Sequence, residues 1–356
     1  MTEIRLPAEK KYEAEIKALA AEDKDAKPPG WKLSPRAVEK YILGDAKKIT
    51  PKYIGDKALI QVAIATLASD RALMLIGEPG TAKSWLSEHL TAAISGSSAL
   101  IVQGTAGTSE EHIKYSWNYA LLLAEGPSAK SLVPSPILRA MREGKFARLE
   151  EITRTSSEVQ DSLISLLSEK QIAIPELNEM VSAQRGFNII ATANSRDRGV
   201  NEMSAALKRR FNFVTVPVVE DLEQEIRIVT KREEELRGDY QVGSEPPAEL
   251  AKLLVTVFQE LRGGMSKDGK QKIKPPSSVL STAEAISVLF NAGILSQQFG
   301  GKKPTPVELF RSLVGAVSKE GADDMKSLRE YAETVAKGRN GLWAEFYRAA
   351  KEHFKG

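Results

Sequence analysis

The sequence predicts a doubly wound α/β domain with a parallel sheet, followed by an all-α domain. Short apolar runs alternate with helical patterns between Ile54 and Pro217, as expected for parallel strands that helices cover on both faces. After Pro217 the strand-like runs stop, and breaks containing glycine and proline divide the rest into helices. The expected strands are 72–76, 99–102, 146–149, 187–191 and 213–216.

An N-terminal segment precedes the α/β domain and carries one short amphipathic pattern. Tyr12, Ile16 and Leu19 share a face of a charged helix, and the two interpretations, a solvated arm and a docked arm, are equally consistent with this face. A polar linker and a short helix with Pro35 at its first position follow. We therefore divide the chain into an N-terminal helical arm with its linker (1–45), the α/β domain (46–217) and the helical domain (218–356).

The composition is that of a globular protein of 356 residues, with 42% hydrophobic and 27% charged residues. The 50 basic and 47 acidic residues leave a net charge of +3, which is too small to predict binding to nucleic acid or to an anionic membrane. The chain has no cysteine, which excludes disulfides and thiolate metal ligands. With no apolar segment at the N-terminus and no run long enough to span a bilayer, we expect a cytoplasmic location and no membrane contact.

The first expected strand leads into a loop with the sequence Gly77-Glu78-Pro79-Gly80-Thr81-Ala82-Lys83-Ser84. A helix is expected to begin near Ala82, so backbone N–H groups and the helix N-terminus can surround a polyphosphate. Lys83 would reach the β- and γ-phosphates of ATP, and the Ser84 hydroxyl would ligate Mg²⁺. Ala82 replaces the usual glycine, and we expect an alanine in the first turn of a helix to be sterically acceptable. The alternative is an ordinary turn between a strand and a helix.

Two adjacent carboxylates, Glu150 and Glu151, follow the expected strand 146–149. Acidic side chains at the end of a buried strand are what Mg²⁺-dependent phosphoryl transfer requires. We assign Glu150 to the metal and Glu151 to the polarisation of the attacking water. Most ATPases with this kind of loop have aspartate at the first position, and the longer glutamate can still act through metal-bound water. The alternative is a strand that runs out into a charged loop.

Polar and basic residues follow at the next two strand boundaries. Asn194 ends the strand that begins at Phe187, and its amide could hold the attacking water or contact the γ-phosphate. A turn-forming role is the alternative for this residue. Arg209 and Arg210 end a short helix before the last strand, where a guanidinium could stabilise charge on a phosphoryl group. The alternative, which the residues by themselves favour, is a solvated helix end stabilised by the helix dipole.

In this order the segments resemble the AAA+ superfamily of P-loop ATPases, and within it the MoxR branch, over residues 54–217. The Ala82-Lys83 pair matches the habit of that branch of placing alanine before the lysine. The run 136–144 also resembles relatives of the CobS/NorQ kind. The other matching segments are Tyr53-Ile54-Gly55-Asp56 on the adenine side, Glu150-Glu151-Ile152-Thr153-Arg154 as Walker B, Ala191-Thr192-Ala193-Asn194 as sensor 1, and Ala206-Leu207-Lys208-Arg209-Arg210-Phe211 as the segment with the arginine finger.

The resemblance implies an AAA+ fold with a helical lid, and a ring, usually a hexamer, that binds ATP with Mg²⁺ between subunits. Arg210 would reach the γ-phosphate held by the neighbouring subunit, with Arg209 as the second choice. Residues 104–134 would hold a helix-2 insert that faces the pore or the substrate, and 171–175 would be a hairpin strand before sensor 1. The residues expected to bind the nucleotide are Gly55, Asp56, Glu78, Pro79, Gly80, Thr81, Ala82, Lys83, Ser84 and Trp85.

The function implied by the resemblance is the remodelling or activation of a protein client, often with a partner that bears a von Willebrand A domain. The motor subunit of a metal-chelatase or cofactor-insertion complex is an alternative, and a nucleic-acid motor is disfavoured by the charge balance and the lack of an evident basic-aromatic stripe. A scaffold that binds ATP and hardly hydrolyses it is a fourth possibility. It is suggested by Glu150 in place of aspartate and by residues 278–284, which lack the arginine that lids of this kind carry as sensor 2.

Overall fold

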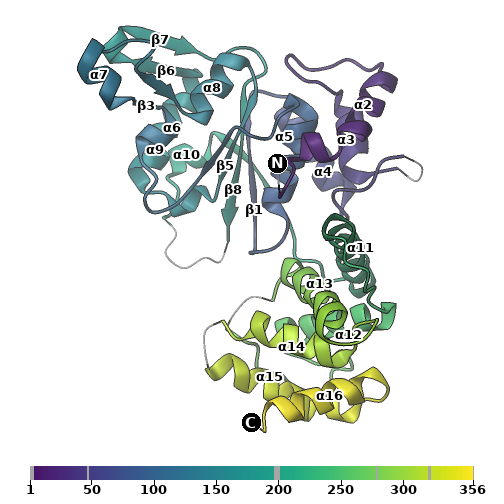
Figure 1. Cartoon of the computed structure of the whole chain (residues 1–356). Coiled ribbons are helices and arrows are strands. Elements are labelled where there is room, and N and C mark those ends of the chain that lie inside the picture. The colour runs from purple at the N-terminus through teal and green to yellow at the C-terminus, as the bar shows by residue number, and fades with distance from the viewer. Residues whose placement is uncertain (1–3, 46–47, 196–200, 278–279, 320–321, 356) are drawn as a thin grey trace. The chain divides into compact units, whose positions relative to one another are not determined.

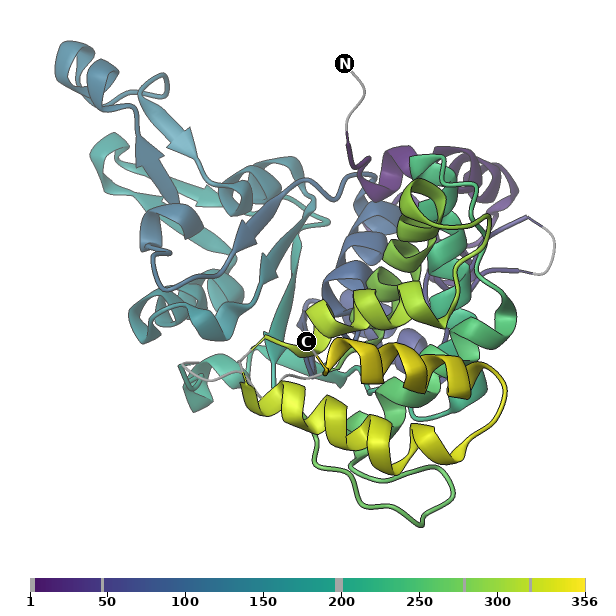
Figure 2. The same cartoon turned by 60° about the horizontal axis from the view of Figure 1, so that its bottom comes forward.

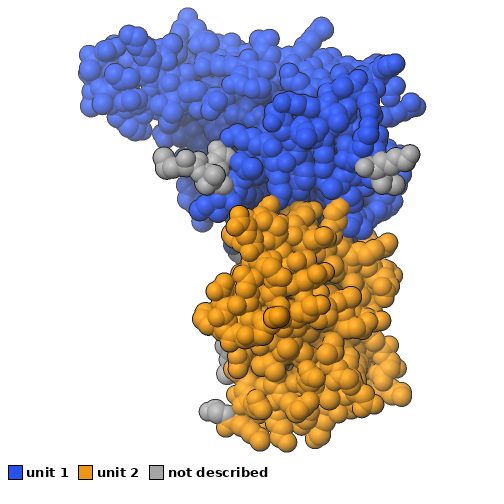
Figure 3. Space-filling model, turned by 45° about the vertical axis from the view of Figure 1, so that its right-hand side comes forward, with its two compact units in different colours: residues 1–78, 82–217 blue, residues 79–81, 218–356 orange. Residues whose placement is uncertain are grey.

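The computed structural model describes residues 4–45, 48–195, 201–277, 280–319 and 322–355, and Figure 1 shows their arrangement in helices and strands. The chain divides into two compact units, which are coloured separately in Figure 3. One unit comprises residues 1–78 and 82–217, and the other comprises residues 79–81 and 218–356. The arm that was expected as a separate segment, residues 1–45, therefore belongs to the same unit as the sheet.

The described strands of the first unit include five that form one sheet in the order β2-β5-β8-β1-β9. All neighbouring pairs in this sheet are parallel, which confirms the predicted doubly wound fold. Leu73 of β1 is in register with Ile190 of β8 on one side and with Asn212 of β9 on the other. The strands are β1 (Ala72–Gly77), β2 (Ile101–Gln103), β5 (Phe146–Glu150), β8 (Asn188–Asn194) and β9 (Phe211–Thr215).

Alternate residues of β1 face two different apolar cores, because successive side chains of a strand point to opposite faces of the sheet. Leu73 and Leu75 pack in a cluster with the helices α3, α4 and α5, whereas Ala72 and Met74 pack in a cluster with α8 and α9. Burial on both faces explains why this strand is a continuous apolar run in the sequence. The helices are α3 (Pro35–Leu43), α4 (Lys57–Leu67), α5 (Lys83–Ser95), α8 (Pro136–Glu143) and α9 (Ser157–Glu169).

The carboxyl ends of the central strands lie along one edge of the sheet. Gly77 at the end of β1 is in register with Asn194 at the end of β8, and Gln103 of β2 is in register with Glu150 of β5. Loops that follow the strands at this edge form the usual ligand-binding crevice of open α/β sheets. The short elements after these strands are η1 (Ile152–Arg154) and α10 (Ala205–Lys208).

Two small antiparallel hairpins extend the first unit, and Figures 1 and 2 both show them at the same end of it. The first occupies the segment where a helix-2 insert was expected, and its helix α7 carries the strongly exposed Leu123, which is 89% accessible. The second contains the strand expected at 171–175, which ends one residue earlier, at Ile174, because Pro175 begins a 3₁₀ turn. The elements are α6 (Glu110–Ile113), β3 (Tyr115–Trp117), α7 (Tyr119–Glu125), β4 (Leu132–Pro134), β6 (Gln171–Ile174), η2 (Pro175–Leu177) and β7 (Glu179–Ser182).

The N-terminal arm is docked on the α/β domain. It forms α1 (Ala8–Lys11) and α2 (Glu13–Glu22), and Tyr12 and Leu19 are buried in the same cluster as residues of α3 and α5. The backbone N–H of Ala8 donates to Glu88 Oε1 at 3.1 Å. Of the two interpretations of the arm, the structure therefore favours docking.

The second unit consists of helices around a core of its own. The predicted breaks between helices are confirmed among the described residues, which are non-helical at 241–247, 264–277, 280–281 and 300–305. Its largest fully buried side chains include Tyr331, Phe258, Phe310 and Phe346. The helices are α11 (Leu222–Tyr240), α12 (Ala248–Gly263), α13 (Thr282–Phe299), α14 (Pro306–Val317), α15 (Ala322–Thr334), η3 (Ala336–Gly338) and α16 (Leu342–His353).

Candidate active site

The predicted phosphate-binding loop joins β1 to α5. It begins where Gly77 ends β1, and α5 begins at Lys83. The Lys83 ammonium is buried and donates to two carbonyl oxygens of the loop, Gly77 O at 3.1 Å and Glu78 O at 2.7 Å. Gly80 has φ +74°, a conformation that favours glycine. Glu78, Pro79, Gly80 and Thr81 lie in this loop, as the motif predicts.

Ala82 adopts a backbone conformation that the sequence argument did not anticipate. It is the N-cap of α5 with φ +67° and ψ +21°, so it precedes the helix and lies in the left-handed region. The expectation that an alanine here sits comfortably in the first helical turn is therefore wrong. A left-handed alanine costs about 1–2 kcal/mol relative to its usual conformation, which explains why glycine is the usual residue.

The Glu150 carboxylate is buried at the end of β5 and accepts four hydrogen bonds, two on each oxygen. Its Oε2 accepts from Ser84 Oγ at 2.6 Å and from Thr192 Oγ1 at 2.7 Å. Its Oε1 accepts from Ser87 Oγ at 2.5 Å and from Arg148 Nη2 at 2.8 Å. The phosphate-binding loop and the acidic strand end, which are far apart in the sequence, are thus joined by direct contacts.

Opposing effects act on the pKa of Glu150. Burial raises the pKa of this carboxyl, but the Arg148 guanidinium and the hydroxyls of Ser84, Ser87 and Thr192 lower it by more, so the net pKa is below the ordinary value. The carboxyl is therefore ionised at neutral pH. An ionised oxygen ligand is what a divalent cation requires at this position.

Glu151 is the next residue, and its backbone leaves the extended conformation of β5. Its φ of +54° places it in the left-handed region, directly before η1. Its backbone N–H donates to Thr192 Oγ1 at 2.9 Å, and its Oε2 lies 3.1 Å from Arg154 Nη1. Strained conformations of this kind are found most often at functional sites. The Thr192 hydroxyl, which contacts both Glu150 and the backbone of Glu151, connects the two carboxylate residues.

Asn194 lies at the same edge of the sheet as these carboxylates. It ends β8 in register with Gly77, and the following residue, Ser195, donates its N–H to Gly77 O at 3.0 Å. The backbone of the sensor-1 strand is thereby tied to the start of the phosphate-binding loop. Asn194 therefore lies beside the start of this loop, and its contact with the attacking water or the γ-phosphate stays a prediction.

Three residues of this network were missed in the choice of site residues: Arg148, Ser87 and Thr192. Thr192 and Arg148 carry a weak signal, since polar residues within otherwise apolar buried strands need partners. Ser87 carries none, because a serine in the first turns of a helix has many ordinary roles.

The two candidate arginine fingers differ in their contacts. Arg210 Nε donates to Ser168 Oγ at 2.9 Å and Arg210 Nη1 donates to Ala206 O at 2.7 Å. Arg209 is exposed, and its backbone oxygen accepts from the Arg71 guanidinium. Both residues lie at the end of α10, beside the first residue of β9.

The remaining residues predicted to bind the nucleotide lie before α4, in the adenine-side segment, and in the first turn of α5. Asp56 is the N-cap of α4, and its carboxylate accepts from Ala58 N at 2.8 Å, as its place before this helix predicted. Gly55 leaves no room for a side chain, since a Cβ there would lie 2.6 Å from the Tyr53 ring. Trp85 Nε1 donates to Lys52 O at 2.8 Å, which connects α5 to this segment.

Magnesium fits the oxygen atoms at this site. Ser84 Oγ and Glu150 Oε2 are both hard oxygen donors and meet at the mouth of the phosphate-binding loop, where ATP phosphates would supply further oxygens. The described residues contain no cluster of three or more His, Cys, Asp or Glu side chains that could hold a metal without a nucleotide. Of the segment expected to carry sensor 2, residues 278 and 279 lie outside the described residues, and Ser281 is the N-cap of α13.

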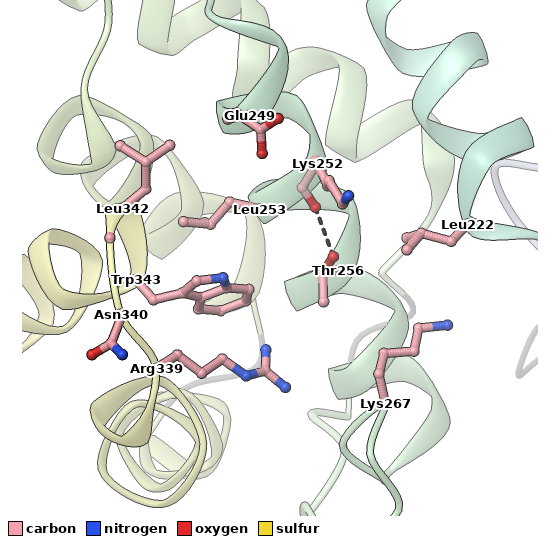
Figure 4. A pocket seen from close by; sticks show the side chains of 11 residues that line it. Leu222, Glu249, Lys252, Leu253, Thr256, Lys267, Arg339, Asn340, Leu342 and Trp343 are labelled. Carbon is pink, nitrogen blue, oxygen red and sulfur yellow. Dashed lines mark hydrogen bonds between the residues drawn. The ribbon is translucent and has the colours of Figure 1, made fainter.

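A separate pocket of about 520 Å³ lies within the helical unit (Figure 4). Its lining includes the Trp343 ring, with the Arg339 guanidinium 4.4 Å from the ring centroid, and the side chains of Lys252 and Lys267. Arg339 is also held by the buried Glu260, with contacts of 2.6 and 3.0 Å. The lining also includes the acidic Glu249, and among the described lining residues none belongs to the predicted nucleotide site.

Two family models match the chain in separate halves. An AAA domain of the dynein-related subfamily matches residues 72–211, and a YehL-like AAA+ ATPase C-terminal domain matches residues 223–353. The chain is also 43% identical to YehL of Escherichia coli (strain K12) over 350 residues, which are 97% of this chain and 96% of that protein. The chain belongs to the YehL-like AAA+ ATPases.

Other comparisons extend this family assignment. A protein of Staphylococcus aureus (strain USA300) is 29% identical over 170 residues, which cover 47% of this YehL-like chain and 60% of that protein. The structure of NtrX from Brucella abortus in complex with ATP has a TM-score of 0.51 at 14% identity, and covers 90% of this chain and 73% of that chain. The ADP complex of NtrX gives a TM-score of 0.50. The likeness to NtrX shows the fold, which is the predicted AAA+ P-loop architecture with a helical C-terminal region.

Membership of the YehL-like AAA+ ATPases supports ATP binding and ATPase activity in general. Among the described helices, none combines the length and the apolar character that are needed to cross a membrane.

Proposed function

We propose that this chain hydrolyses ATP with Mg²⁺ and uses the energy to remodel or activate a protein client. The observation that carries the proposal is the hydrogen-bonded group at the carboxyl edge of the sheet. There Ser84 of the phosphate-binding loop and Thr192 of β8 both contact one oxygen of Glu150, at 2.6 and 2.7 Å. Glu151 follows directly and shares the Thr192 hydroxyl through its backbone N–H.

Each residue of the site has a distinct role in the proposed reaction. The Lys83 ammonium would exchange the loop carbonyls for the β- and γ-phosphate oxygens, and Ser84 and Glu150 would hold the metal. Bound Mg²⁺ would supply charge neutralisation of the phosphates. Glu151 accepts a proton from the attacking water, and the Asn194 amide orients that water. In these assignments Glu150 takes the metal-binding role that an aspartate has in most ATPases with this kind of loop.

The proposed assembly is a ring of identical subunits, a hexamer by resemblance to the MoxR branch. In such a ring the nucleotide lies at a subunit boundary, and an arginine from the neighbour completes the site. Arg210 is the first candidate and Arg209 the second. The sequence of residues 278–284 contains no arginine or lysine, so in the proposed ring the completing cation would come from the neighbouring subunit.

The proposed client is a protein, and a partner with a von Willebrand A domain is proposed from the same resemblance. The hairpin β3–β4 with its helix α7 supports a protein-facing surface, because Tyr119 and Leu123 are 61% and 89% exposed. Large apolar side chains exposed side by side are typical of interaction sites. The balance of charge, +3 over the chain, gives no support to a nucleic-acid substrate.

The decisive experiment is the substitution Glu151→Gln. We expect ATP turnover to fall by about 10²–10⁴-fold, since the proton acceptor is lost, with MgATP affinity within about threefold of the parent. The variant should therefore accumulate in the ATP-bound state, and its ring should retain the client for identification by mass spectrometry. Lys83→Ala is the matched control that should lose ATP binding itself.

The outcomes separate the candidate functions. Turnover by Glu151→Gln at the parent rate would refute the assignment of the base. A parent protein that binds ATP without measurable turnover would instead favour a nucleotide-dependent scaffold. A metalloprotein or chelatase partner retained by the trapped ring would favour the cofactor-insertion alternative over general remodelling.

A further inference from the structure

The strand that carries the metal carboxylate also carries a buried arginine. Arg148 precedes Glu150 by two residues on β5, so both side chains point to the same face of the sheet, toward α5. Arg148 is 6% exposed and Glu150 is 2% exposed. A buried arginine in a sheet core is costly unless its donors are satisfied, so its contacts bear on its role.

The Arg148 guanidinium donates four hydrogen bonds, of which one goes from Nη1 to Ser98 O at 3.5 Å and the other three lie around the first turns of α5. Nε donates to Ser87 Oγ at 2.8 Å, and Nη2 donates to Glu150 Oε1 at 2.8 Å and to Ser84 O at 3.0 Å. Ser87 Oγ in turn donates to the same Oε1 of Glu150 at 2.5 Å. Arginine suits such a site because its planar fork holds several acceptors in one fixed geometry.

These contacts divide the two oxygens of the Glu150 carboxylate. Oε1 is held by Arg148 and Ser87, whereas Oε2 is the oxygen that contacts the predicted metal ligand Ser84. A glutamate has one more rotatable bond than an aspartate, so at this position it needs more restraint to keep one oxygen in place. Arg148 and Ser87 supply that restraint.

We propose that Arg148 is a positioning residue of the magnesium site, which holds Oε1 of Glu150 so that Oε2 faces Ser84 and the bound metal. With this restraint, Glu150 can hold the metal at a position where an aspartate is usual. The inference rests on the proposed function, because it requires that Ser84 and Glu150 hold Mg²⁺ together with ATP.

A different role for Arg148 predicts the opposite effect on the metal. If the guanidinium served only to neutralise charge, its removal would leave the site more negative and would strengthen Mg²⁺ binding. If it positions the carboxylate, its removal frees the Glu150 side chain and weakens Mg²⁺ binding. The sign of the change therefore separates the two roles.

The test is a titration of Mg²⁺ against the affinity for a fluorescent ATP analogue, with Arg148→Met compared with the parent. We expect the half-saturating Mg²⁺ concentration to rise by about tenfold or more, as for other residues that orient a metal ligand. The analogue affinity measured in EDTA should stay within about twofold, since the substitution keeps Lys83 and the glycines of the loop. Arg148→Lys should recover part of the loss.

Two further variants make the test specific. Arg142→Met on α8 is the matched control, since this arginine lies outside the network and contacts Glu179 at 3.8 Å. Ser87→Ala removes the second donor to Oε1 and should shift the Mg²⁺ requirement in the same direction by a smaller factor. This variant keeps the test possible if Arg148→Met fails to fold.

An unchanged or a lower Mg²⁺ requirement in both Arg148→Met and Ser87→Ala would overturn the inference and leave the proposed ATPase intact. A parent protein whose analogue binding shows no dependence on Mg²⁺ would refute the metal assignment itself, and the inference with it.

Discussion

At the scale of single residues, Thr192 contacts both functional carboxylate residues. Its hydroxyl donates to Glu150 Oε2 and accepts from the backbone N–H of Glu151. We expect Thr192→Val, which keeps the shape and removes the hydroxyl, to lower kcat by about 10–100-fold, because the Glu150 carboxylate and the backbone of Glu151 each lose an orienting contact. MgATP turnover kinetics provide the measurement. Thr192→Ser keeps the hydroxyl and should keep most of the activity, and equal losses in both variants would contradict this role.

Ala82 allows a prediction about stability. Because its φ is +67°, glycine should fit this position with less strain. We expect Ala82→Gly to raise the free energy of unfolding by about 1 kcal/mol or less, since relief of the left-handed strain exceeds the entropic cost of glycine. The reverse change at Gly80, which has φ +74°, should destabilise. Urea unfolding of both variants gives the answer, and a lower midpoint for Ala82→Gly would count against the assigned conformation.

The residue scale also shows what sequence alone could supply for the site. Lys83, Ser84 and Glu150 could be predicted because the motif and the strand order fix their separation in space. The contacts of Thr192 and Ser87 could not, because they depend on the register of β5 against β8 and on the rotation of α5. A sequence pattern fixes neither the strand register to within one residue nor the rotation of the helix about its axis.

At the scale of elements, the N-terminal arm depends on one buried lysine. Lys52 Nζ lies 4.1 Å from the Tyr12 ring centroid and 4.7 Å from that of Tyr41, and it pairs with Glu15 of α2. The backbone oxygen of Lys52 accepts from Trp85 on α5. One residue thus joins the arm to the helix that follows the phosphate-binding loop.

We expect Lys52→Met to lower the free energy of unfolding by up to about 3 kcal/mol, because the partly buried Glu15 carboxylate loses its counter-charge and the Tyr12 and Tyr41 rings lose the cation beside them. Limited proteolysis should then cut within the arm before the sheet. Lys48→Met is the matched control, since Lys48 forms an exposed pair with Glu22 and should change stability by less than about 1 kcal/mol. An arm as resistant to protease as that of the parent would argue against this role.

The helices and strands differ in how well the sequence predicts them. The buried strands were predicted within a few residues, because burial on both faces leaves an unbroken apolar run. The packing of the arm could not be predicted from its own residues. The apolar face formed by Tyr12, Ile16 and Leu19 indicates that another element covers it, but does not identify that element. Its partners come from α3 and α5, and only the folded chain brings them together.

At the scale of the whole molecule, the proposed ring predicts complementation between inactive subunits. Lys83→Ala removes ATP binding and Arg210→Ala removes the proposed finger, so each protein alone should lose at least about 10²-fold in turnover. Mixed rings place an intact loop from one variant beside an intact arginine from the other. Turnover of the mixture should therefore recover to a substantial fraction of the parent rate.

Arg209→Ala serves as the matched control in the same mixing experiment. If Arg209→Ala lost turnover alone and recovered it in the mixture, whereas Arg210→Ala kept the parent rate alone, the role would pass to Arg209, which is the more exposed of the two. If Arg210→Ala and Arg209→Ala each kept the parent rate on their own, neither arginine would complete a neighbour's site. Light scattering with and without ATP would show whether the variants still assemble.

The side chains of β5 point alternately to the two faces of the sheet, and this has a consequence for how the chain folds. Arg148 and Glu150 point toward α5, whereas Ala147 and Leu149 belong to the apolar cluster on the other face. A slip of this strand by one residue would bury both charges against Val159 and Leu163 of α9 without their hydroxyl partners, at a cost of several kcal/mol. The ionic residues of the site therefore also select the correct alignment of the sheet, so a misaligned intermediate would be rejected before any nucleotide is present.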